Sequence, residues 1–136
     1  GQKSKLFDNV SQLLDSLDSR GIDFGVVTNK SSRFTIPLLS QFDLLGRIKT
    51  LVCGDEVKNR KPDPEPLFKA LDKSKNSYNS SNVYYVGDAK KDISSARAAD
   101  IRSIACTYGY RDANDDPKSW ESEFIINNIM RVNEIV

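Results

Sequence analysis

The stretch that decides the fold is VYYVGDAKKD, residues 83–92. It opens with the apolar run Val83–Val86, whose β-branched and aromatic residues are typical of a buried strand. Gly87 and Asp88 end this run, and a helix follows at once. The apolar face of that helix consists of Ile93, Ala96 and Ala99. A strand that leads directly into a helix is the repeating unit of parallel α/β proteins.

The same alternation continues on both sides of this stretch. Short apolar runs predict further strands at residues 24–27, 51–53 and 101–106, with another apolar run at 124–126. Amphipathic stretches predict helices between and beyond these runs, the last of them ending at Val136. We therefore expect an α/β fold with a doubly wound parallel sheet, whose helices cover both faces.

Three further helices have predicted starts and inward faces. The first is capped by Asn9 and turns inward Val10, Leu13, Leu14 and Leu17. The second begins near Ser32 or Arg33 and turns inward Phe34, Leu38, Leu39 and Phe42. The third takes Asp63 as N-cap and Pro64 as first helical residue, and turns inward Leu67, Phe68, Ala70 and Leu71.

The composition describes one domain with its own core. The chain has 136 residues, of which 38% are hydrophobic and 29% charged, and its formal net charge is +1. We expect no nucleic acid partner, because a basic excess is lacking. We expect no membrane contact either, because no apolar run approaches the roughly 18–20 residues of a spanning helix. No signal peptide is visible, and Cys53 and Cys106 lie in apolar segments typical of buried thiols, so we expect a cytoplasmic protein.

The sequence contains no histidine, which restricts its chemistry. Serine–histidine and cysteine–histidine nucleophiles and histidine-bound zinc are all excluded. Carboxylates, lysine and threonine remain. Carboxylate oxygens are ligands for hard cations, so we expect Mg²⁺ as the cofactor.

Polar residues follow the predicted strands at the points where ligands bind in such folds. Thr28 ends the first strand, and Lys61 lies in the loop after the second. Asp88 ends the third strand, and Asp92 follows one helical turn later. A hydroxyl, a lysine and two carboxylates at one sheet edge describe a phosphoryl-transfer centre that lacks its nucleophile.

Each of these residues also has an ordinary structural interpretation. Asp88 can cap the following helix while Asp92 interacts with its dipole. Thr28 can serve the turn after its strand, and Lys61 can be a solvated surface lysine. The residues taken singly leave both interpretations open.

Three segments in this order resemble known signature motifs. They are VVTNK at residues 26–30, KPDPEPL at 61–67 and VGDAKKD at 86–92. They resemble the second, third and fourth motifs of the haloacid dehalogenase-like (HAD) hydrolases, which have a Rossmann-type core. The later segment with Tyr108-Gly109-Tyr110, Asp116-Pro117 and Trp120 is most similar to the phosphoglycolate phosphatase branch.

The resemblance implies a role for each matched residue. Thr28 would bind the phosphoryl group with help from the Asn29 backbone N–H, and Lys61 would clamp the phosphate and the nucleophile. Asp88 would be a direct Mg²⁺ ligand. Asp92 would be a second acid of the metal site, acting directly or through water.

The first motif of the family, a strand ending in Asp-x-Asp, has no counterpart in these residues. Asp8 is followed at the required spacing by Val10, and Asp23 precedes its strand and is followed by Gly25. We therefore expect residues 1–136 to be the C-terminal part of a HAD core, without its first central strand and its cap. That strand would lie between the predicted strands at 24–27 and 83–86. We expect the exposed strand edges to rearrange, to self-associate or aggregate, or to hold a retained N-terminal piece.

The resemblance implies part of a Mg²⁺-dependent phosphatase for a small phosphorylated acid, most specifically 2-phosphoglycolate. The reaction would pass through an aspartyl-phosphate, so this chain alone would be inactive. A non-catalytic phosphate and Mg²⁺ binding module is an alternative, as are a sugar-phosphate mutase and a phosphonate-cleaving enzyme of the same family. A receiver domain is disfavoured, because its acidic pair precedes its threonine and lysine, whereas here Thr28 and Lys61 come before Asp88.

Overall fold

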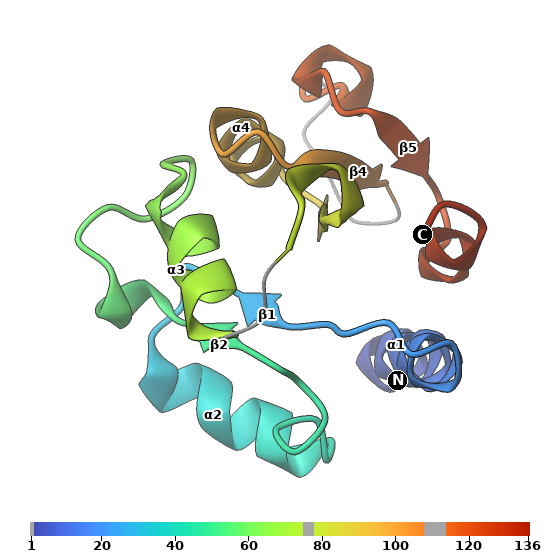
Figure 1. The fold of residues 1–136 in the computed structure, drawn as a ribbon. Helices are drawn as coiled ribbons and strands as arrows, with labels where there is room; N and C mark the ends of the chain where they lie inside the picture. Colours follow the sequence, from blue (N-terminus) through green and yellow to red (C-terminus); the bar gives the residue numbers. More distant parts are fainter. Residues whose placement is uncertain (1, 75–77, 108–113) are drawn as a thin grey trace.

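Figure 1 shows the computed structural model of the chain, which describes residues 2–74, 78–107 and 114–136. The α-helices are α1 (Gln2–Ser19), α2 (Ser32–Gln41), α3 (Glu65–Lys73) and α4 (Lys90–Ala98). The strands are β1 (Val26–Val27), β2 (Leu51–Val52), β3 (Tyr84–Gly87), β4 (Arg102–Cys106) and β5 (Phe124–Ile126). Short 3₁₀ helices are η1 (Gly54–Glu56), η2 (Ser80–Asn82), η3 (Pro117–Trp120) and η4 (Ile129–Glu134). The predicted break at Gly109 lies outside the described residues.

The strands form two parallel sheets. One pairs β1 with β2, and the other has the order β3-β4-β5. Val26 is in register with Leu51, and Val86 is in register with Ile104. The α/β class and the parallel pairing predicted from the sequence are therefore confirmed.

The larger sheet is covered on both faces. Ile104 and Cys106 of β4 pack in one apolar cluster with Leu13 and Leu17 of α1. Ala105 points the other way, into a cluster with Ile93 of α4 and Trp120. This alternation is the period of a strand, and it places helices on opposite faces, as a doubly wound sheet requires. Figure 1 shows α4 and α1 on the two sides of β4.

The two sheets are separated by an apolar cavity of about 440 Å³. Its walls include Val26 and Val27 of β1, and residues 84–86 of β3. Side chains of α1, α3 and η4 also line it, among them Leu13, Leu67 and Val132. β1 pairs with β2, and β3 pairs with β4. Within residues 2–74, 78–107 and 114–136, the edges of β1 and β3 that line the cavity therefore have no strand partner.

Several element boundaries differ from the prediction. α1 begins at Gln2, so Asn9 lies inside the helix and does not cap it. α3 begins at Glu65 with Pro64 as its N-cap, one residue later than predicted, and Asp63 Oδ1 accepts a hydrogen bond from the Glu65 N–H. The stretch before Val136 forms the 3₁₀ helix η4.

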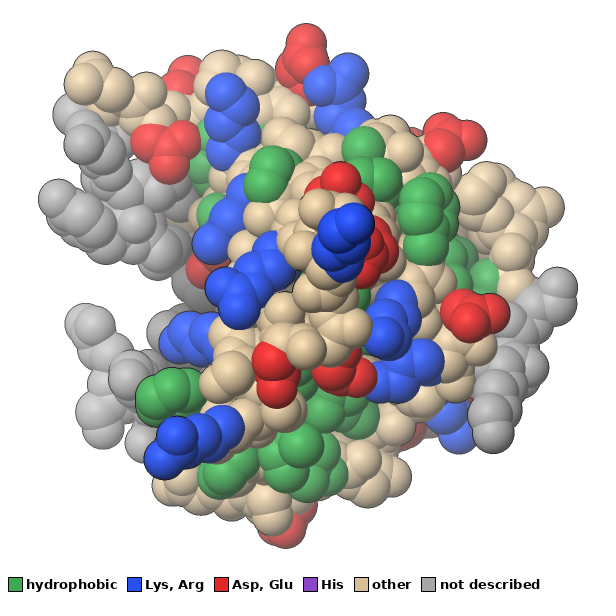
Figure 2. Space-filling model, turned by 90° about the vertical axis from the view of Figure 1, so that its left-hand side faces the viewer, with side chains coloured by type: hydrophobic (Ala, Val, Ile, Leu, Met, Phe, Trp, Pro, Cys, Tyr) green, Lys and Arg blue, Asp and Glu red, His purple; other side chains and the backbone are tan. Residues whose placement is uncertain are grey.

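The predicted inward faces of α2 and α3 are partly wrong. Phe34 is 73% exposed, Leu38 42% and Phe68 52%. The residues of α2 that are buried are Thr35 and Leu39, one turn apart. α3 packs against β1 and β2, and these strands are two residues long, so the sheet surface that they offer to the helix is short. Figure 2 shows hydrophobic side chains gathered at the lower edge of the molecule, where α2 lies in Figure 1.

Within the ranges that the structure describes, none of the helices is both long enough and apolar enough to cross a lipid bilayer. The face in Figure 2 carries lysines and arginines interspersed with acidic side chains rather than one basic field. This distribution agrees with the formal charge of +1.

Candidate active site

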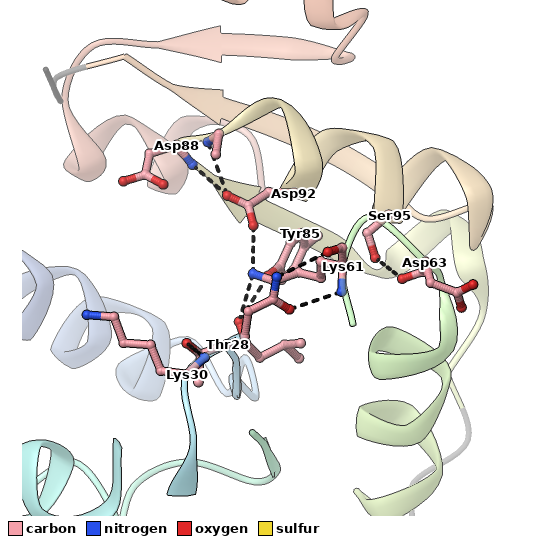
Figure 3. Close-up of polar contacts among 11 residues, drawn as sticks. Thr28, Lys30, Lys61, Asp63, Tyr85, Asp88, Asp92 and Ser95 are labelled. Atoms are coloured by element: carbon pink, nitrogen blue, oxygen red, sulfur yellow. Dashed lines mark hydrogen bonds and ion pairs between the residues drawn. The ribbon is translucent and has the colours of Figure 1, made fainter. Parts of the chain in front are cut away.

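The four residues selected from the sequence lie together at the carboxyl ends of β1 and β3 (Figure 3). Thr28 follows β1, and Asp88 follows β3. Asp92 lies in the first turn of α4, and Lys61 comes from the loop between η1 and α3. Residues that are up to 64 positions apart in the sequence therefore lie close together at one end of these strands.

Lys61 is a buried lysine and not a solvated one. Its side chain is 7% exposed, and its ammonium group donates to three acceptors. Nζ lies 2.6 Å from Asp92 Oδ1, 2.8 Å from Tyr85 Oη and 3.3 Å from the Val27 carbonyl oxygen. All three ammonium protons are thus used within the protein.

Asn29 fixes the backbone of Lys61. Its side-chain Nδ2 donates to the Lys61 carbonyl at 3.1 Å, and its Oδ1 accepts from the Lys61 N–H at 3.0 Å. The sequence motif implied a role only for the backbone N–H of Asn29, and this reciprocal pair was not predicted. The amide side chain of Asn29 offers one donor and one acceptor, which pair with the acceptor and the donor of the Lys61 backbone. These two bonds hold the loop that carries Lys61 beside the end of β1.

Asp92 is the anionic partner of Lys61 and is itself 5% exposed. Its second oxygen, Oδ2, accepts from the backbone N–H groups of Asp88 at 3.2 Å and Ala89 at 3.1 Å. A carboxylate with a lysine on one oxygen and two backbone donors on the other is fully compensated for its burial. It also locks the turn between β3 and α4.

Gly87 is required by this arrangement. A Cβ atom at position 87 would lie 2.2 Å from the Cβ of Asp92 and 2.7 Å from its Oδ2. The close approach between the end of β3 and Asp92 is therefore compatible only with glycine. This explains physically why a glycine ends the strand that decides the fold.

Asp88 differs from Asp92 in its surroundings. It is exposed, and Figure 3 shows its carboxylate directed away from Lys61. Among the described residues, no hydrogen bond or ion pair is formed by its carboxylate oxygens; only its backbone N–H is bonded, to Asp92. Asp88 is thus the open acidic group of the site.

Thr28 takes part in the local turn. Its hydroxyl oxygen accepts from the Lys30 N–H at 3.1 Å, and its own N–H donates to the Val52 carbonyl at 3.0 Å. A hydroxyl that accepts one bond keeps its proton for another acceptor. The hydroxyl group of Thr28 therefore stabilises the local turn as an acceptor, and its proton remains available for a hydrogen bond to an anion.

Tyr85 belongs to the site but was not predicted from the sequence. Its hydroxyl accepts from Lys61 Nζ and donates to the Val27 carbonyl at 3.0 Å. Burial raises its pKa, and the negative charges of Asp92 and Asp88 raise it further, so the phenol stays protonated. The available signal was a tyrosine in a buried strand, since a buried phenol needs a hydrogen-bond partner.

The donor set suits a hard cation only in part. Throughout the ranges described, no three aspartate, glutamate, histidine or cysteine side chains are grouped closely enough to hold a metal ion. Asp88 offers an open carboxylate, whereas both oxygens of Asp92 already have partners. A Mg²⁺ ion at this edge would need further oxygen ligands from water, substrate or another segment.

Comparison with known proteins gives consistent matches. A family model described as haloacid dehalogenase-like hydrolase matches residues 1–106. The chain is 38% identical over 133 residues to an N-acetylmuramic acid 6-phosphate phosphatase of Pseudomonas putida, covering 98% of this chain and 59% of that protein. It is 37% identical over 126 residues to a phosphoglycolate phosphatase of Xanthomonas campestris pv. campestris, covering 93% and 56%.

The fold match is equally broad. The crystal structure of a predicted phosphoglycolate phosphatase from Haemophilus somnus 129PT superposes with a TM-score of 0.84 at 26% identity, covering 93% of this chain and 55% of that one. The chain therefore spans between half and three fifths of the length of these relatives.

Proposed function

Because the chain belongs to the haloacid dehalogenase-like hydrolases, we propose that it forms the phosphate-binding part of a phosphatase for small phosphorylated acids. The observation that carries this proposal is the buried ammonium group of Lys61. Asp92 holds this ammonium group, and the Asn29 side chain holds the Lys61 backbone, at the carboxyl ends of β1 and β3 beside Thr28. A fixed cation next to a hydroxyl donor suits the charge of a phosphoryl group.

Each residue has a defined part in the proposed reaction. Thr28 donates a hydrogen bond from its hydroxyl group to a phosphoryl oxygen. The backbone N–H of Asn29 donates a second hydrogen bond to the phosphoryl group. Lys61 neutralises the phosphate while Asp92 holds the ammonium group in place. Preorganised groups of this kind stabilise the charge of the transition state without rearranging during the reaction.

We propose that the nucleophilic aspartate comes from a segment outside these 136 residues. Two observations support this. The relatives are longer, since the chain covers 54–59% of the lengths of the first two. In addition, β1 and β3 face each other across an apolar cavity of about 440 Å³. A strand in that gap would pair with both edges and end next to Lys61, where its carboxylate would form the aspartyl-phosphate.

The proposed cofactor is Mg²⁺. When bound, it would neutralise charge on the phosphoryl oxygens. Asp88 would hold it directly, because its carboxylate is exposed and open, and Asp92 would act through water, because Lys61 and two backbone N–H groups occupy its oxygens. The absence of a third acidic group among the described residues fits a ligand contributed by the segment outside the chain.

The proposed substrate is 2-phosphoglycolate, as one member of a class. The names of the two relatives compared above both denote phosphorylated acids, a phosphoglycolate and a muramic acid 6-phosphate. A monophosphate that also carries a carboxylate is what they share. By itself, without the outside segment, the chain would be a phosphate-binding module without turnover.

We also propose the cytoplasm as the compartment. Cys53 and Cys106 are both buried in the core as thiols. Buried thiols of this kind fit a reducing environment.

The test is phosphate release from 2-phosphoglycolate and from N-acetylmuramic acid 6-phosphate by the purified chain with Mg²⁺, with intact-mass analysis of the same sample. We expect no turnover from a sample that contains only this polypeptide. Turnover with a second polypeptide in the mass spectrum, abolished by Asp88→Asn, would support a retained strand. Turnover by the single polypeptide would contradict the proposed source of the nucleophile.

A further inference from the structure

We propose that Ser95 is a positioning residue of the candidate site, because its hydroxyl group fastens the loop that carries Lys61 to helix α4. This role rests on the proposed function, since it takes Lys61 as the residue that neutralises the phosphate. Ser95 lies in the interior of α4, outside the three segments that resemble signature motifs.

Ser95 binds the main chain of the loop. The serine is fully buried, and its Oγ donates to the carbonyl oxygen of Asp63 at 2.7 Å (Figure 3). Asp63 stands two residues after Lys61, between Pro62 and Pro64. Neither proline has an N–H group, so this part of the loop has few donors with which to attach itself to a neighbouring element. In the described parts of the chain, the bond from Ser95 is the one hydrogen bond that joins the main chain here to α4.

Helix α4 therefore holds Lys61 at two points. Asp92 and Ser95 are three positions apart, so their side chains lie on the same face of the helix. Asp92 binds the Lys61 ammonium group at 2.6 Å, and Ser95 binds the main chain just beyond that lysine. A lysine side chain is long and flexible, and fixing both its head and its main chain leaves the charge in one place.

The same contacts fix Lys61 relative to Asp88. Asp92 accepts from the backbone N–H groups of Asp88 and Ala89, so the turn that carries the open carboxylate belongs to the same hydrogen-bonded unit. Without the Ser95 bond, the loop and α4 could shift relative to each other, and the ammonium group could not follow both. A charge that is held in advance binds an anion without a further cost of ordering.

The probe is inorganic phosphate, titrated into the 136-residue chain and followed by ³¹P NMR. We expect Ser95→Ala to weaken phosphate binding by about fivefold, the size typical of one lost hydrogen bond. The matched control is Ser103→Ala. Ser103 is 3% exposed, and its Oγ accepts from the Glu123 N–H at 3.1 Å, away from the loop. This control also removes a buried bond between a serine and the backbone, and we expect it to change phosphate binding by less than about twofold.

The two variants also separate positioning from stability. Both should lower the urea midpoint, because each loses a buried hydrogen bond. Only Ser95→Ala should shift the ¹⁵N signal of Lys61 Nζ, which reports the surroundings of the ammonium group. Equal weakening of phosphate binding by both variants, or an unchanged Lys61 signal in Ser95→Ala, would overturn the inference.

A double variant tests whether Ser95 acts through the lysine. In a Lys61→Gln background, adding Ser95→Ala should cause no further loss of phosphate binding. A fivefold loss that persists in this background, or wild-type affinity in Ser95→Ala alone, would contradict the positioning role. Phosphate binding that is unaffected by Lys61→Gln would instead overturn the proposed function, and the role of Ser95 with it.

If Ser95→Ala does not fold, Ser95→Cys provides the test. A thiol is close in size to the hydroxyl group but is a weaker hydrogen-bond donor. We expect phosphate binding to weaken by about twofold or more, together with a shift of the Lys61 Nζ signal. Wild-type affinity with an unchanged Lys61 signal would overturn the inference.

Discussion

Strand β4 differs from the facing strands β1 and β3 in how completely its two edges are paired. β4 has a strand on each side, and Ile104, Ala105 and Cys106 are at most 2% exposed. β1 and β3 each have a strand on one side and the cavity on the other, and Val27 and Val86 are only half-buried. Yet Thr28 and Asp88 follow β1 and β3, so the candidate site lies at the less complete part of the fold.

The difference has an energetic meaning, because the apolar side chains along the facing edges of β1 and β3 are less completely buried than those of β4. The gap is therefore a place where burial remains to be gained by a further strand, a second copy or local collapse.

The largest effect is expected at the site itself, from Lys61→Met. This change leaves the Asp92 carboxylate, whose side chain is 7% exposed, without its counter-charge. Removing one partner of a buried pair costs about 3–5 kcal/mol. Urea unfolding checks this, with Lys58→Met as the control, because Lys58 is an exposed lysine of the same loop. An equal effect of the two changes would show that the Lys61 pair is solvated.

The contrast between the strands predicts the next effect. Ile104→Ala in β4 should reduce the free energy of unfolding by about 3 kcal/mol, because Ile104 is fully buried and closely packed. Val86→Ala, on the wall of the cavity, should cost less than half as much, since the side chain already borders empty space. Equal losses in urea unfolding would mean that the gap is closed in solution.

Gly87→Ala tests the close contact between the end of β3 and Asp92 in the turn before α4. The added Cβ would meet Asp92 at 2.2 Å, so we expect a loss of about 1–3 kcal/mol in thermal unfolding. Gly46→Ala is the matched control, because a Cβ at that position meets no atom within 4 Å. A neutral Gly87→Ala variant would contradict the close packing of Asp92 against the end of β3.

The smallest effect concerns the half of the molecule around β2. Asp55 accepts from the Ser32 N–H at 2.8 Å and from its hydroxyl at 2.6 Å, and these bonds lower the pKa of Asp55. The stabilisation is therefore present above the unfolded pKa of about 3.9 and is lost as the pH falls through the lower folded pKa. Asp55→Asn should be slightly less stable than wild type at pH 7, and the two urea midpoints should converge as the pH falls through the folded pKa of Asp55. A difference between the two urea midpoints that grows on acidification would contradict the hydrogen bonds assigned to Asp55.

The sequence located the parts of the site that depend on local order. Thr28 and Asp88 follow strands, and a polar residue after an apolar run marks the ligand-binding end of a parallel sheet whatever the tertiary packing. Asp92 follows from helical spacing. These positions are local consequences of strand and helix periodicity.

The contacts between distant segments could not be predicted in this way. The bonds of Lys61 to Asn29 and Tyr85 join residues more than 20 positions apart, and they depend on how the loop after η1 lies across the strand ends. The exposure of Phe34 on α2 likewise depends on tertiary packing, which a period-based pattern does not specify. Periodicity identifies an apolar face but not the width of the surface available to cover it.

The most direct test of the open gap is amide hydrogen exchange of β3, resolved by residue with NMR. Arg102 N–H donates to the Val83 carbonyl, so alternate residues of β3 face β4, and the Tyr85 and Gly87 amides belong to that side. The Tyr84 and Val86 amides face the cavity. We predict slow exchange for Tyr85 and Gly87, and exchange faster by about 100-fold or more for Tyr84 and Val86. Equal protection of all four amides would contradict the account, because it would show that a strand already pairs with the facing edge of β3.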